Sequence, residues 1–442
     1  MNANELHPFH LFHYREDYFV INVETMQADA VDQHTFSRLE KLTAKDSLAE
    51  LTPVMQIKLR QPPITYMSLL VTQSCNLRCV YCYEDKKSAR MNDATAFRAV
   101  DWLIKKSEAM RSLNIIFFGG EPLLNFPLIE AVVDYAKDAA KKSDKYVSFT
   151  LITNGTLLDD EINLFLQKHQ IRVTISFDGL KELQDSQRPF ASGSGSYDRV
   201  IPKIKNLLKL MPQTASHAVI MGDNSPETIK DALQELGFHR VTVALNSQSP
   251  FTKGNQAVNT SDRDTRAMLS ALEEEAKSWY DLIKKRDIAS IKKLTGRSNL
   301  YLALLSLMKQ SKKRFFCGAG QSMVAVNPSG DIYLCHRFVD LDDYRIGSIH
   351  EDELNLESFC QSPVDANDTC KQCFAKYYCG GGCKHDHLTS CGSVNEPEQR
   401  MCLLKQRELE LAATVVSRLS NEDRNWLVKE NLFPPKPCPL DF

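Results

Sequence analysis

Three cysteines lie close together in the stretch SCNLRCVYCYE. They are Cys75, Cys79 and Cys82, and the aromatic Tyr81 directly precedes the third thiol. Thiols at these spacings fit half of a zinc site, a redox pair with a spare thiol, or three ligands of an iron–sulfur cluster. Zinc needs a fourth ligand nearby, yet the nearest histidine after Cys82 is His169. Three thiolates on a four-iron cube instead leave one iron open to another molecule.

A second group of cysteines lies in the C-terminal part of the chain. Of thirteen cysteines, three lie at 75–82, none at 83–316 and ten from Cys317 onward. One tetrahedral zinc ion, as in a zinc ribbon, uses only four thiolates, so seven in one ordered pattern favour two clusters. The seven, with the spacing C-x17-C, C-x2-C-x5-C-x3-C and C, are Cys317, Cys335, Cys370, Cys373, Cys379, Cys383 and Cys402. We expect no ligand role for the other three cysteines, Cys360, Cys391 and Cys438.

Composition indicates the class of protein. The chain has 442 residues, 43% hydrophobic and 25% charged, which is typical of a globular protein of two or three domains. A net charge of −2 gives no general attraction for nucleic acid or anionic membranes. The first thirty residues lack a signal-peptide pattern, and no window has transmembrane character, so we expect a cytoplasmic protein. Disulfides are rare in that compartment, which favours metal or cluster ligation.

Short apolar segments predict the strands that must position these residues. Apolar strands that alternate with helices predict a parallel α/β sheet, and six units are too few to close an eight-stranded barrel. We therefore expect a partial (β/α)6 parallel barrel with SCNLRC, GGEP, TNG and SFDG at its C-terminal strand ends, where the chemistry of such barrels lies. The strands are expected at 67–73, 113–120, 147–155, 171–179, 216–222 and 240–246, and the helices at 93–110, 126–142, 158–169, 197–210 and 225–237.

Five segments are expected along the chain. The first is a small N-terminal α+β domain with a strand pair in 10–24, turning near Glu16, and a helix at 34–42. A connector of two helices and a helical tail from about Met401 to Val428 are expected further on. The segments are 1–64 for the small domain, 65–260 for the barrel, 261–311 for the connector, 312–405 for a loop-rich cysteine domain, and 406–442 for the C-terminal helix and tail.

The motifs in this order resemble the radical S-adenosylmethionine (SAM) superfamily, over about residues 66–402. The resemblance is carried by CxxxCxxC after the first strand and GGEPLL after the second. It implies a [4Fe–4S] cluster on the first three cysteines, whose open iron binds SAM and whose electron releases a 5′-deoxyadenosyl radical. Glu121 would meet the amino group of the methionine part and Arg188 its carboxylate. The residues implied for SAM binding are Tyr81, Gly119, Gly120, Glu121, Asn154, Ser176, Asp178 and Arg188.

The seven later cysteines resemble the SPASM extension of peptide-modifying radical enzymes, which binds two auxiliary clusters. The resemblance brings the total to three [4Fe–4S] clusters. It implies Cys370, Cys373, Cys379 and Cys402 for an outer cluster, and Cys317, Cys335 and Cys383 for an inner one. Some relatives carry a further cysteine just before the position of Cys317, but QSKKRFF has none. The inner cluster then keeps an open iron, which could bind a substrate thiolate, or recruits Cys360, Cys391 or another group.

The predicted function is maturation of a ribosomally made precursor peptide. A carbon radical would close a thioether or a carbon–carbon crosslink, with a second electron leaving through the auxiliary clusters. The alternative is anaerobic sulfatase-maturating dehydrogenation of a protein Cys or Ser. Relatives with that activity carry an aspartate after the position of Cys335, whereas this chain has His336, the candidate catalytic residue. From another class, the chain could be a non-catalytic iron–sulfur electron carrier or a zinc scaffold, which would form no 5′-deoxyadenosine.

The resemblance also implies partners. The N-terminal strands and helix resemble a shortened leader-peptide recognition domain, whose strand edge would pair with an extended leader. A small cap that supports the barrel is the competing interpretation. Flavodoxin or ferredoxin would supply the electrons, and neither nucleic acid nor a membrane is expected. Phe117, Met221 and Asn246 would line the barrel interior and either touch substrate or pack the core.

Overall fold

The computed structural model describes residues 8–43, 62–220, 225–245, 262–351, 353–355 and 363–433. Met221, Asn246, Cys360 and Cys438 lie outside the described residues. The chain divides into two compact units. The barrel unit comprises residues 59–260 and 318–361, and the cysteine-rich unit comprises 1–58, 261–317 and 362–442. The five segments expected from the sequence stay a prediction.

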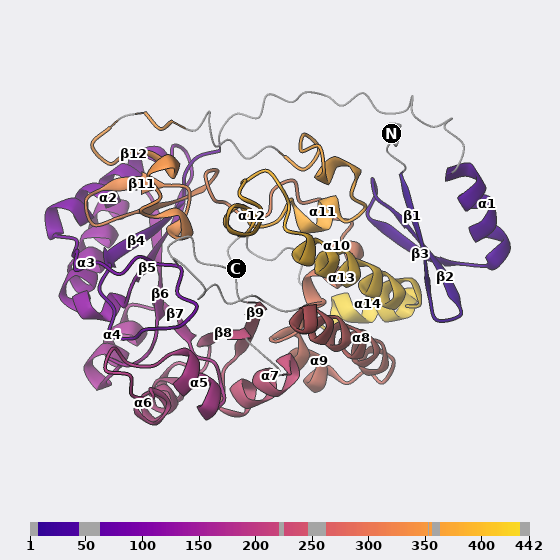
Figure 1. Ribbon diagram of the computed structural model, residues 1–442, viewed down its shortest axis with the longest axis horizontal. Coiled ribbons are helices and arrows are strands. Elements are labelled where there is room, and N and C mark those ends of the chain that lie inside the picture. Colours follow the sequence, from indigo (N-terminus) through magenta and orange to yellow (C-terminus); the bar gives the residue numbers. More distant parts are fainter. Residues whose placement is uncertain are drawn as a thin grey trace. The chain divides into compact units, whose positions relative to one another are not determined.

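The barrel unit contains a nine-stranded sheet in the order β12-β11-β10-β4-β5-β6-β7-β8-β9 (Figure 1). Strands β4 to β9 are parallel to their neighbours, and β10 adds to β4 in parallel. Strands β11 and β12 continue antiparallel from β10. The strands are β4 (Tyr66–Thr72), β5 (Ser112–Gly119), β6 (Tyr146–Thr153), β7 (Arg172–Ser176), β8 (Ala215–Ile220), β9 (Arg240–Leu245), β10 (Met323–Val326), β11 (Asp331–Tyr333) and β12 (Arg345–Ser348).

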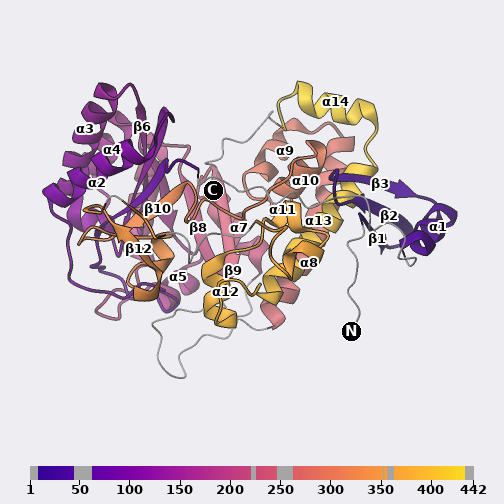
Figure 2. The same cartoon turned by 90° about the horizontal axis from the view of Figure 1, so that it is seen from above.

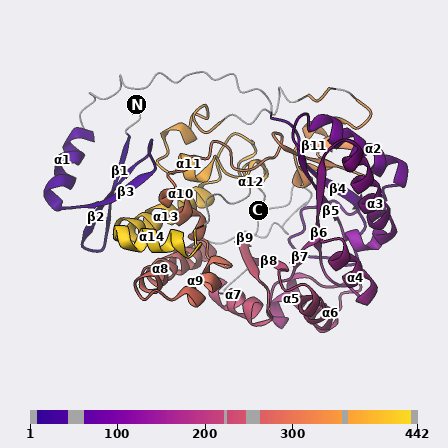
Figure 3. The same ribbon diagram turned by 180° about the vertical axis from the view of Figure 1, so that it is seen from behind.

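Helices connect successive parallel strands, and α2, α3 and α4 lie along the outer side of the sheet (Figure 3). Side-chain caps start two of them: Asn92 accepts a hydrogen bond from the Thr95 N–H, and Asp159 accepts one from the Ile162 N–H. Phe117 is fully buried and stacks on Phe149, which places it in the core. The helices are α2 (Asp93–Lys106), α3 (Phe126–Lys142), α4 (Asp160–Lys168), α5 (Lys181–Gln187), α6 (Tyr197–Leu210) and α7 (Pro226–Glu235).

The open parallel sheet confirms the α/β fold class and the six expected strands within a few residues at each end. One helix was not expected. Its sequence, KELQDSQ, has little apolar periodicity, because the face of α5 that is buried includes Gln184 and Gln187. Polar residues buried through hydrogen bonds leave no hydrophobic pattern to detect.

The cysteine-rich unit begins with a three-stranded antiparallel sheet, β1 (Phe9–Tyr14), β2 (Asp17–Asn22) and β3 (Gln27–Val31), followed by α1 (Gln33–Thr43). Figure 2 shows this sheet beside the unit's long helices. Helix α13 packs against β2, β3, α8 and α10. The other helices are α8 (Asp262–Lys284), α9 (Ile288–Thr295), α10 (Tyr301–Met308), α11 (Lys376–Cys379), α12 (Lys384–Cys391), α13 (Gln399–Ser417) and α14 (Asn421–Lys429).

Three details of this unit differ from the expectation. The strand pair has a third strand, β3, whose sequence QADAV carries only a weak alternation. The connector has three helices rather than two, because Asp287 caps a new helix. The C-terminal tail is two helices, because Ser420 and Asp423 form a capping box that starts α14. Within the described residues, no helix has the length and apolar character needed to cross a membrane.

Candidate active site

The first cysteine triplet lies in a loop just after β4. The Sγ of Cys75 accepts from the Leu77 N–H at 3.4 Å and from the Asn154 side-chain amide at 3.9 Å. Burial raises the pKa of Cys75 to about 12 and that of Cys82 to about 11, and the charge of Cys79 adds to both shifts. Thiols that resist ionisation this strongly become thiolates when a metal neutralises them.

The CxxxCxxC spacing of the triplet, rather than a preformed ion site, indicates an iron–sulfur cluster. In the described part of the chain, no three His, Cys, Asp or Glu side chains converge closely enough to hold one metal ion. A cube with irons at separate corners spreads its thiolates further apart than one ion does. Backbone hydrogen bonds anchor the cysteine loop to the end of α5 and the segment after it: the Arg78 N–H bonds the Pro189 carbonyl at 2.8 Å and the Val80 N–H bonds the Gln187 carbonyl at 2.9 Å.

Two glycines let the end of β5 approach the cysteine loop. The Gly120 N–H bonds the Thr72 carbonyl at 3.0 Å, and the Glu121 N–H bonds the Ser74 carbonyl at 2.9 Å. A Cβ on Gly119, whose φ is +134°, would lie 1.9 Å from the Thr72 carbonyl oxygen. A Cβ on Gly120 would lie 2.4 Å from the Ser74 carbonyl oxygen. Only glycine permits this contact between the two strand ends.

We expect Gly119→Ala to lower the free energy of unfolding by about 2–3 kcal/mol, because its Cβ would overlap backbone. Chemical denaturation measures this cost. Gly193→Ala is the matched control, because Gly193 also has a positive φ, +86°, but a Cβ there meets nothing within 4 Å. A loss no larger than that of Gly193→Ala would show that the end of β5 can move away from β4.

Glu121 is a fully buried carboxylate between the second and third strand ends. It accepts hydrogen bonds from the Thr153 hydroxyl at 2.6 Å, the Asn154 N–H at 2.8 Å and the Leu123 N–H at 3.1 Å. Burial raises its pKa to about 7, although these donors act in the opposite direction. The site therefore holds a carboxylate, poised near neutrality, that has no cationic partner among the described residues.

Asn154 links the third strand end to the first cysteine. Its side-chain NH2 group donates to the side-chain oxygen of Asn76 at 3.0 Å. Its own side-chain oxygen accepts from the Thr156 hydroxyl at 2.6 Å. Asn76, which follows Cys75, donates in turn to Thr156 at 2.8 Å. Ser176 ends β7 and is half-buried. Asn154, which the sequence assigned to the site, is thus joined to the cysteine loop, and Asn76 and Thr156, which the sequence did not identify, complete the link.

Asp178, fully buried after β7, is the most heavily bonded carboxylate of the site. It accepts from the Tyr81 hydroxyl at 2.7 Å, from Arg188 Nε at 3.0 Å and Nη2 at 3.1 Å, and from the Val219 N–H at 3.0 Å. Burial raises the pKa of Tyr81 well above its usual value, so the hydroxyl stays a donor. The guanidinium of Arg188 lies 5.1 Å from the Tyr81 ring centroid. Asp178 therefore fixes both the arginine and the aromatic of the cysteine loop.

Gln184 and Ser196 link Asp178 to Arg188 through a chain of hydrogen bonds. The side-chain carbonyl of Gln184 accepts from the Asp178 N–H at 2.9 Å, and its amide donates to the Ser196 hydroxyl at 2.8 Å. Ser196 donates to the Arg188 carbonyl at 2.7 Å. The sequence did not identify Gln184 or Ser196, because a polar residue that bonds other protein atoms has no spacing signature of its own.

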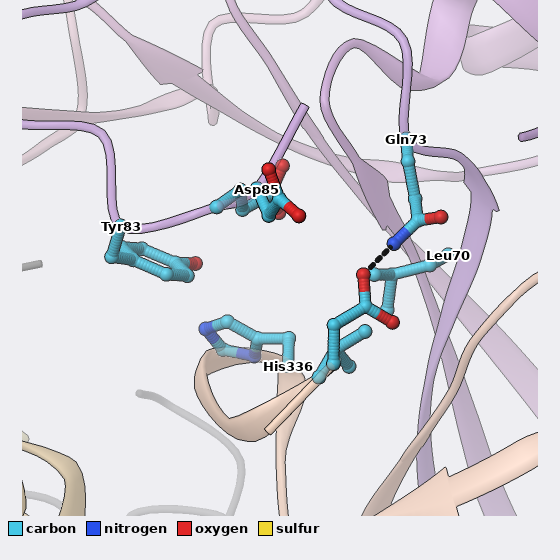
Figure 4. A pocket seen from close by; sticks show the side chains of 8 residues that line it. Leu70, Gln73, Tyr83, Asp85 and His336 are labelled. Atoms are coloured by element: carbon cyan, nitrogen blue, oxygen red, sulfur yellow. Dashed lines mark hydrogen bonds between the residues drawn. The ribbon is translucent and has the colours of Figure 1, made fainter. Parts of the chain in front are cut away.

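A small pocket lies between the cysteine loop and the segment after Cys335 (Figure 4). Burial raises the pKa of Glu84 there to about 7. Asp340 accepts hydrogen bonds from the Gln73 amide and from the Lys87 ammonium group, the latter at 2.8 Å. The lining residues are Leu70, Gln73, Tyr83, Glu84, Asp85, His336, Val339 and Asp340. Sequence patterns did not identify this pocket, since its residues come from distant segments.

Two histidines in the barrel unit are neutral. Burial lowers the pKa of His336 to about 3 and that of His217 to about 4, and nearby arginines add to both shifts. The ring of His336 packs 4.4 Å from that of Phe118. Within the described structure, its buried Nδ1 has no hydrogen-bond partner. The catalytic role of His336 stays a prediction, and His217 is a further site residue that the strand pattern alone did not single out.

The outer set of later cysteines gathers within the cysteine-rich unit. Burial raises the pKa of Cys402 to about 12, and the charges of Cys379, Cys373 and Cys370 add to that shift, which places the four thiols near one another. The Gln406 amide donates to the Cys373 Sγ at 3.5 Å. The assignment of these four cysteines to a cluster stays a prediction.

The inner set, Cys317, Cys335 and Cys383, draws residues from both compact units and stays a prediction. Cys391 belongs to neither set by its contacts. Its half-buried thiol donates to the Pro397 carbonyl at 3.8 Å.

Comparison with known proteins agrees with this geometry. The sequence model of the Radical SAM superfamily matches residues 69–247. An uncharacterized protein of Methanocaldococcus jannaschii is 30% identical over 271 residues, which are 61% of this chain and 84% of that protein. A cysteine-type anaerobic sulfatase-maturating enzyme of Clostridium perfringens is 24% identical over 343 residues, 73% and 89% of the two chains. The mycofactocin maturase MftC of Mycolicibacterium smegmatis is 25% identical over 324 residues, which are 71% of this chain and 76% of that protein.

Solved structures share the fold. The enzyme anSMEcpe with bound AdoMet and a Cp18Cys peptide superposes with a TM-score of 0.64 at 20% identity, over 82% of this chain and 100% of that one. Streptococcus suis SuiB bound to precursor peptide SuiA superposes with a TM-score of 0.53 at 15% sequence identity, over 89% of this chain and 98% of that one.

The open parallel barrel, with a partly buried thiol triplet at its first strand end and a buried carboxylate at its second, defines an enzyme that works through an iron–sulfur cluster and SAM. The chain belongs to the radical SAM superfamily, and its relatives include maturases of proteins and peptides.

Proposed function

We propose that this enzyme matures a ribosomally made precursor peptide by closing a thioether or carbon–carbon crosslink. The observation that carries the proposal is the N-terminal three-stranded sheet, which accompanies the barrel and the seven-cysteine pattern. In the described residues, the outer edges of β1 and β3 have no paired strand. An extended leader peptide could add a strand to either edge. SuiB, which shares the fold, binds a precursor peptide.

The cofactors follow from the donor sets. Cys75, Cys79 and Cys82 would hold the cluster that binds SAM, and the two SPASM sets would hold two auxiliary [4Fe–4S] clusters, three in total. When bound, the first cluster and SAM supply a 5′-deoxyadenosyl radical that removes a hydrogen atom from the peptide. Glu121 would accept a hydrogen bond from the amino group of SAM. Asp178 holds Tyr81 and Arg188 in place through hydrogen bonds. Flavodoxin or ferredoxin would supply the electrons.

The overall reaction balances if the peptide loses two hydrogens. One leaves as an atom that converts the radical to 5′-deoxyadenosine. For a thioether, the other leaves a cysteine thiol as a proton when the carbon–sulfur bond forms, and one electron must then be accepted. An auxiliary cluster held by the later cysteines would supply the acceptor for this one electron per crosslink.

The pKa of Glu121 gives a pH dependence. A carboxyl whose pKa is about 7 is charged above that pH and neutral below it. We therefore expect the affinity of the reconstituted enzyme for SAM to fall as pH decreases through 7, and Glu121→Gln to bind SAM about tenfold to a hundredfold more weakly with little pH dependence. Equilibrium dialysis between pH 6 and 8 measures both. Unchanged binding by Glu121→Gln would remove this residue from the SAM site.

Sulfatase-type maturation is the second candidate. The likeness in sequence to a cysteine-type anaerobic sulfatase-maturating enzyme favours it. His336 stands against it, since the expected aspartate is missing after Cys335, and a buried imidazole with a pKa of about 3 is a weak proton acceptor.

Mass spectrometry of a short peptide encoded beside this gene, co-expressed anaerobically with the enzyme, tests the proposal. We expect a loss of two hydrogens. One cysteine newly resistant to alkylation would indicate a thioether, and fully reactive thiols with a new bond between residues would indicate a carbon–carbon crosslink. An unchanged peptide, together with aldehyde formation in a sulfatase-derived peptide, would favour the second candidate.

A further inference from the structure

The N-terminal sheet contacts the ligand loop, residues 370–379, which carries three cysteines of the outer set, Cys370, Cys373 and Cys379. Glu24 lies in the turn between β2 and β3, and its carboxylate pairs with Lys376 at 3.3 Å and with Lys312 at 2.9 Å. The Tyr377 hydroxyl donates to the same carboxylate at 3.2 Å. Lys376 and Tyr377 lie between Cys373 and Cys379 in the sequence. One glutamate of the sheet therefore binds the middle of the ligand loop.

His10 makes a second contact from β1. Its ring stacks in parallel on Phe374, with 3.4 Å between the ring centroids. Phe374 directly follows Cys373. The Nε2 of His10 also bonds Glu410 at 3.0 Å, and Glu410 lies on α13, the helix that carries Cys402 near its start. His10 thus touches both segments that supply the outer set of cysteines.

Two arginines, Arg407 within α13 and Arg418 at its C-cap, attach the sheet to that helix. Arg407 lies 5.4 Å from the ring centroid of Tyr14. Arg418 lies 5.2 Å from the ring centroid of Phe19 and forms an ion pair with Asp17. The sheet is therefore fixed to α13 while Glu24 and His10 reach the ligand loop.

The ligand loop has little regular structure of its own. Between residues 370 and 379 it contains one 3-10 turn, Cys370–Gln372, and the single turn of α11. Lys376 is 5% exposed, so its charge needs a nearby anion, and Glu24 supplies one. Donors and packing residues outside the ligand set fix metal ligands in place and typically change metal affinity when removed.

We propose that the N-terminal sheet positions the outer auxiliary cluster, with Glu24 and His10 as its positioning residues. The proposal rests on the assignment of Cys370, Cys373, Cys379 and Cys402 to a cluster, but not on the identity of the substrate. It has a consequence for any truncation. Removing residues 1–43 would loosen the cluster, so lost activity in such a variant would not by itself show lost leader binding.

Cluster retention tests this directly. In full-length protein with Cys75, Cys79 and Cys82 changed to alanine, the remaining iron reports only the auxiliary clusters. We expect Glu24→Ala and His10→Ala to lose about four irons per chain to a chelator about tenfold faster than the parent. Glu24→Gln keeps the acceptor for Tyr377 but loses both ion pairs. We expect it to lose iron at a rate between those of the parent and Glu24→Ala. Absorbance near 400 nm and iron analysis follow the loss.

Matched controls separate positioning from sheet stability. Asp29→Asn removes an exposed carboxylate of β3 that bonds Gln27. His13→Ala disturbs the sheet, since His13 packs on Tyr18 and Phe36, without touching the ligand loop. Both should release iron at the parental rate. If His13→Ala releases iron as fast as Glu24→Ala, or if Glu24→Ala and His10→Ala match Asp29→Asn, the positioning role is refuted.

A second measurement keeps the two proposals distinguishable. If the parent binds no auxiliary iron, the cluster assignment fails. Hydrogen exchange of residues 370–383 in the iron-free protein then still tests the contacts. Faster exchange in Glu24→Ala than in Asp29→Asn supports them, and equal exchange overturns them.

Discussion

Changing Cys79 to alanine is expected to abolish the formation of 5′-deoxyadenosine from SAM by the anaerobic, reduced enzyme. Cys75 and Cys82 alone cannot hold a cube with one open iron, and residues 76–81 contain no other thiol that could replace Cys79. Chromatography coupled to mass spectrometry measures the product. The central cysteine of the triplet therefore decides between an enzyme and a passive carrier.

Cys391→Ala is the control for that experiment. Cys391 is half-buried and bonds only the Pro397 carbonyl among the contacts that the structure describes, so its loss should leave product formation unchanged. Wild-type amounts of 5′-deoxyadenosine from Cys79→Ala would contradict the cluster assignment. No product from the wild-type protein would favour the carrier or the zinc scaffold.

Asp178→Asn is expected to lower the free energy of unfolding by about 3–5 kcal/mol, a typical cost of leaving one member of a buried ion pair unpaired. Burial alone would lower the pKa of Arg188, and the charge of Asp178 raises it. Arginine keeps its proton in proteins, so this guanidinium stays charged and unpaired when Asp178 is lost. The NH2 group of the new amide would face one of two sets of donors, either Tyr81 with Arg188 Nε or the Val219 N–H with Arg188 Nη2. Denaturant titration of the apo protein measures the change.

Two further variants make the Asp178 experiment specific. In Asp178→Asn/Arg188→Gln the buried charge is gone from both partners, so part of the stability should return. Asp198→Asn breaks an exposed pair with Lys181 and should cost less than about 1 kcal/mol. Equal small losses for Asp178→Asn and Asp198→Asn would show that Asp178 does not organise the site.

The barrel could be predicted from sequence because its strands are continuous apolar segments. Strand β4, YMSLLVT, is almost entirely buried, and the motifs that follow such strands are local in sequence. The thiol triplet was found by type and spacing and Glu121 by the resemblance of its motif to the family, and the structure places both at neighbouring strand ends.

The rest of the site depends on contacts between distant residues. Asp178 bonds Tyr81, 97 positions away, and Gln73 bonds Asp340, 267 positions away. Helix α5 is held by buried glutamines rather than by an apolar stripe. The link from Glu24 to Lys376 joins two segments with no shared motif. Such pairs become visible only when the chain is folded.

The most direct test of the central claim is deuterium transfer from peptide to SAM. The precursor peptide is prepared with its carbon-bound hydrogens replaced by deuterium and incubated anaerobically with the reduced enzyme and SAM. We predict 5′-deoxyadenosine carrying one deuterium, and a peptide that has lost one deuterium and one exchangeable hydrogen if a thioether forms. Unlabelled 5′-deoxyadenosine beside an unmodified peptide would contradict the claim that this enzyme acts on that peptide by hydrogen abstraction.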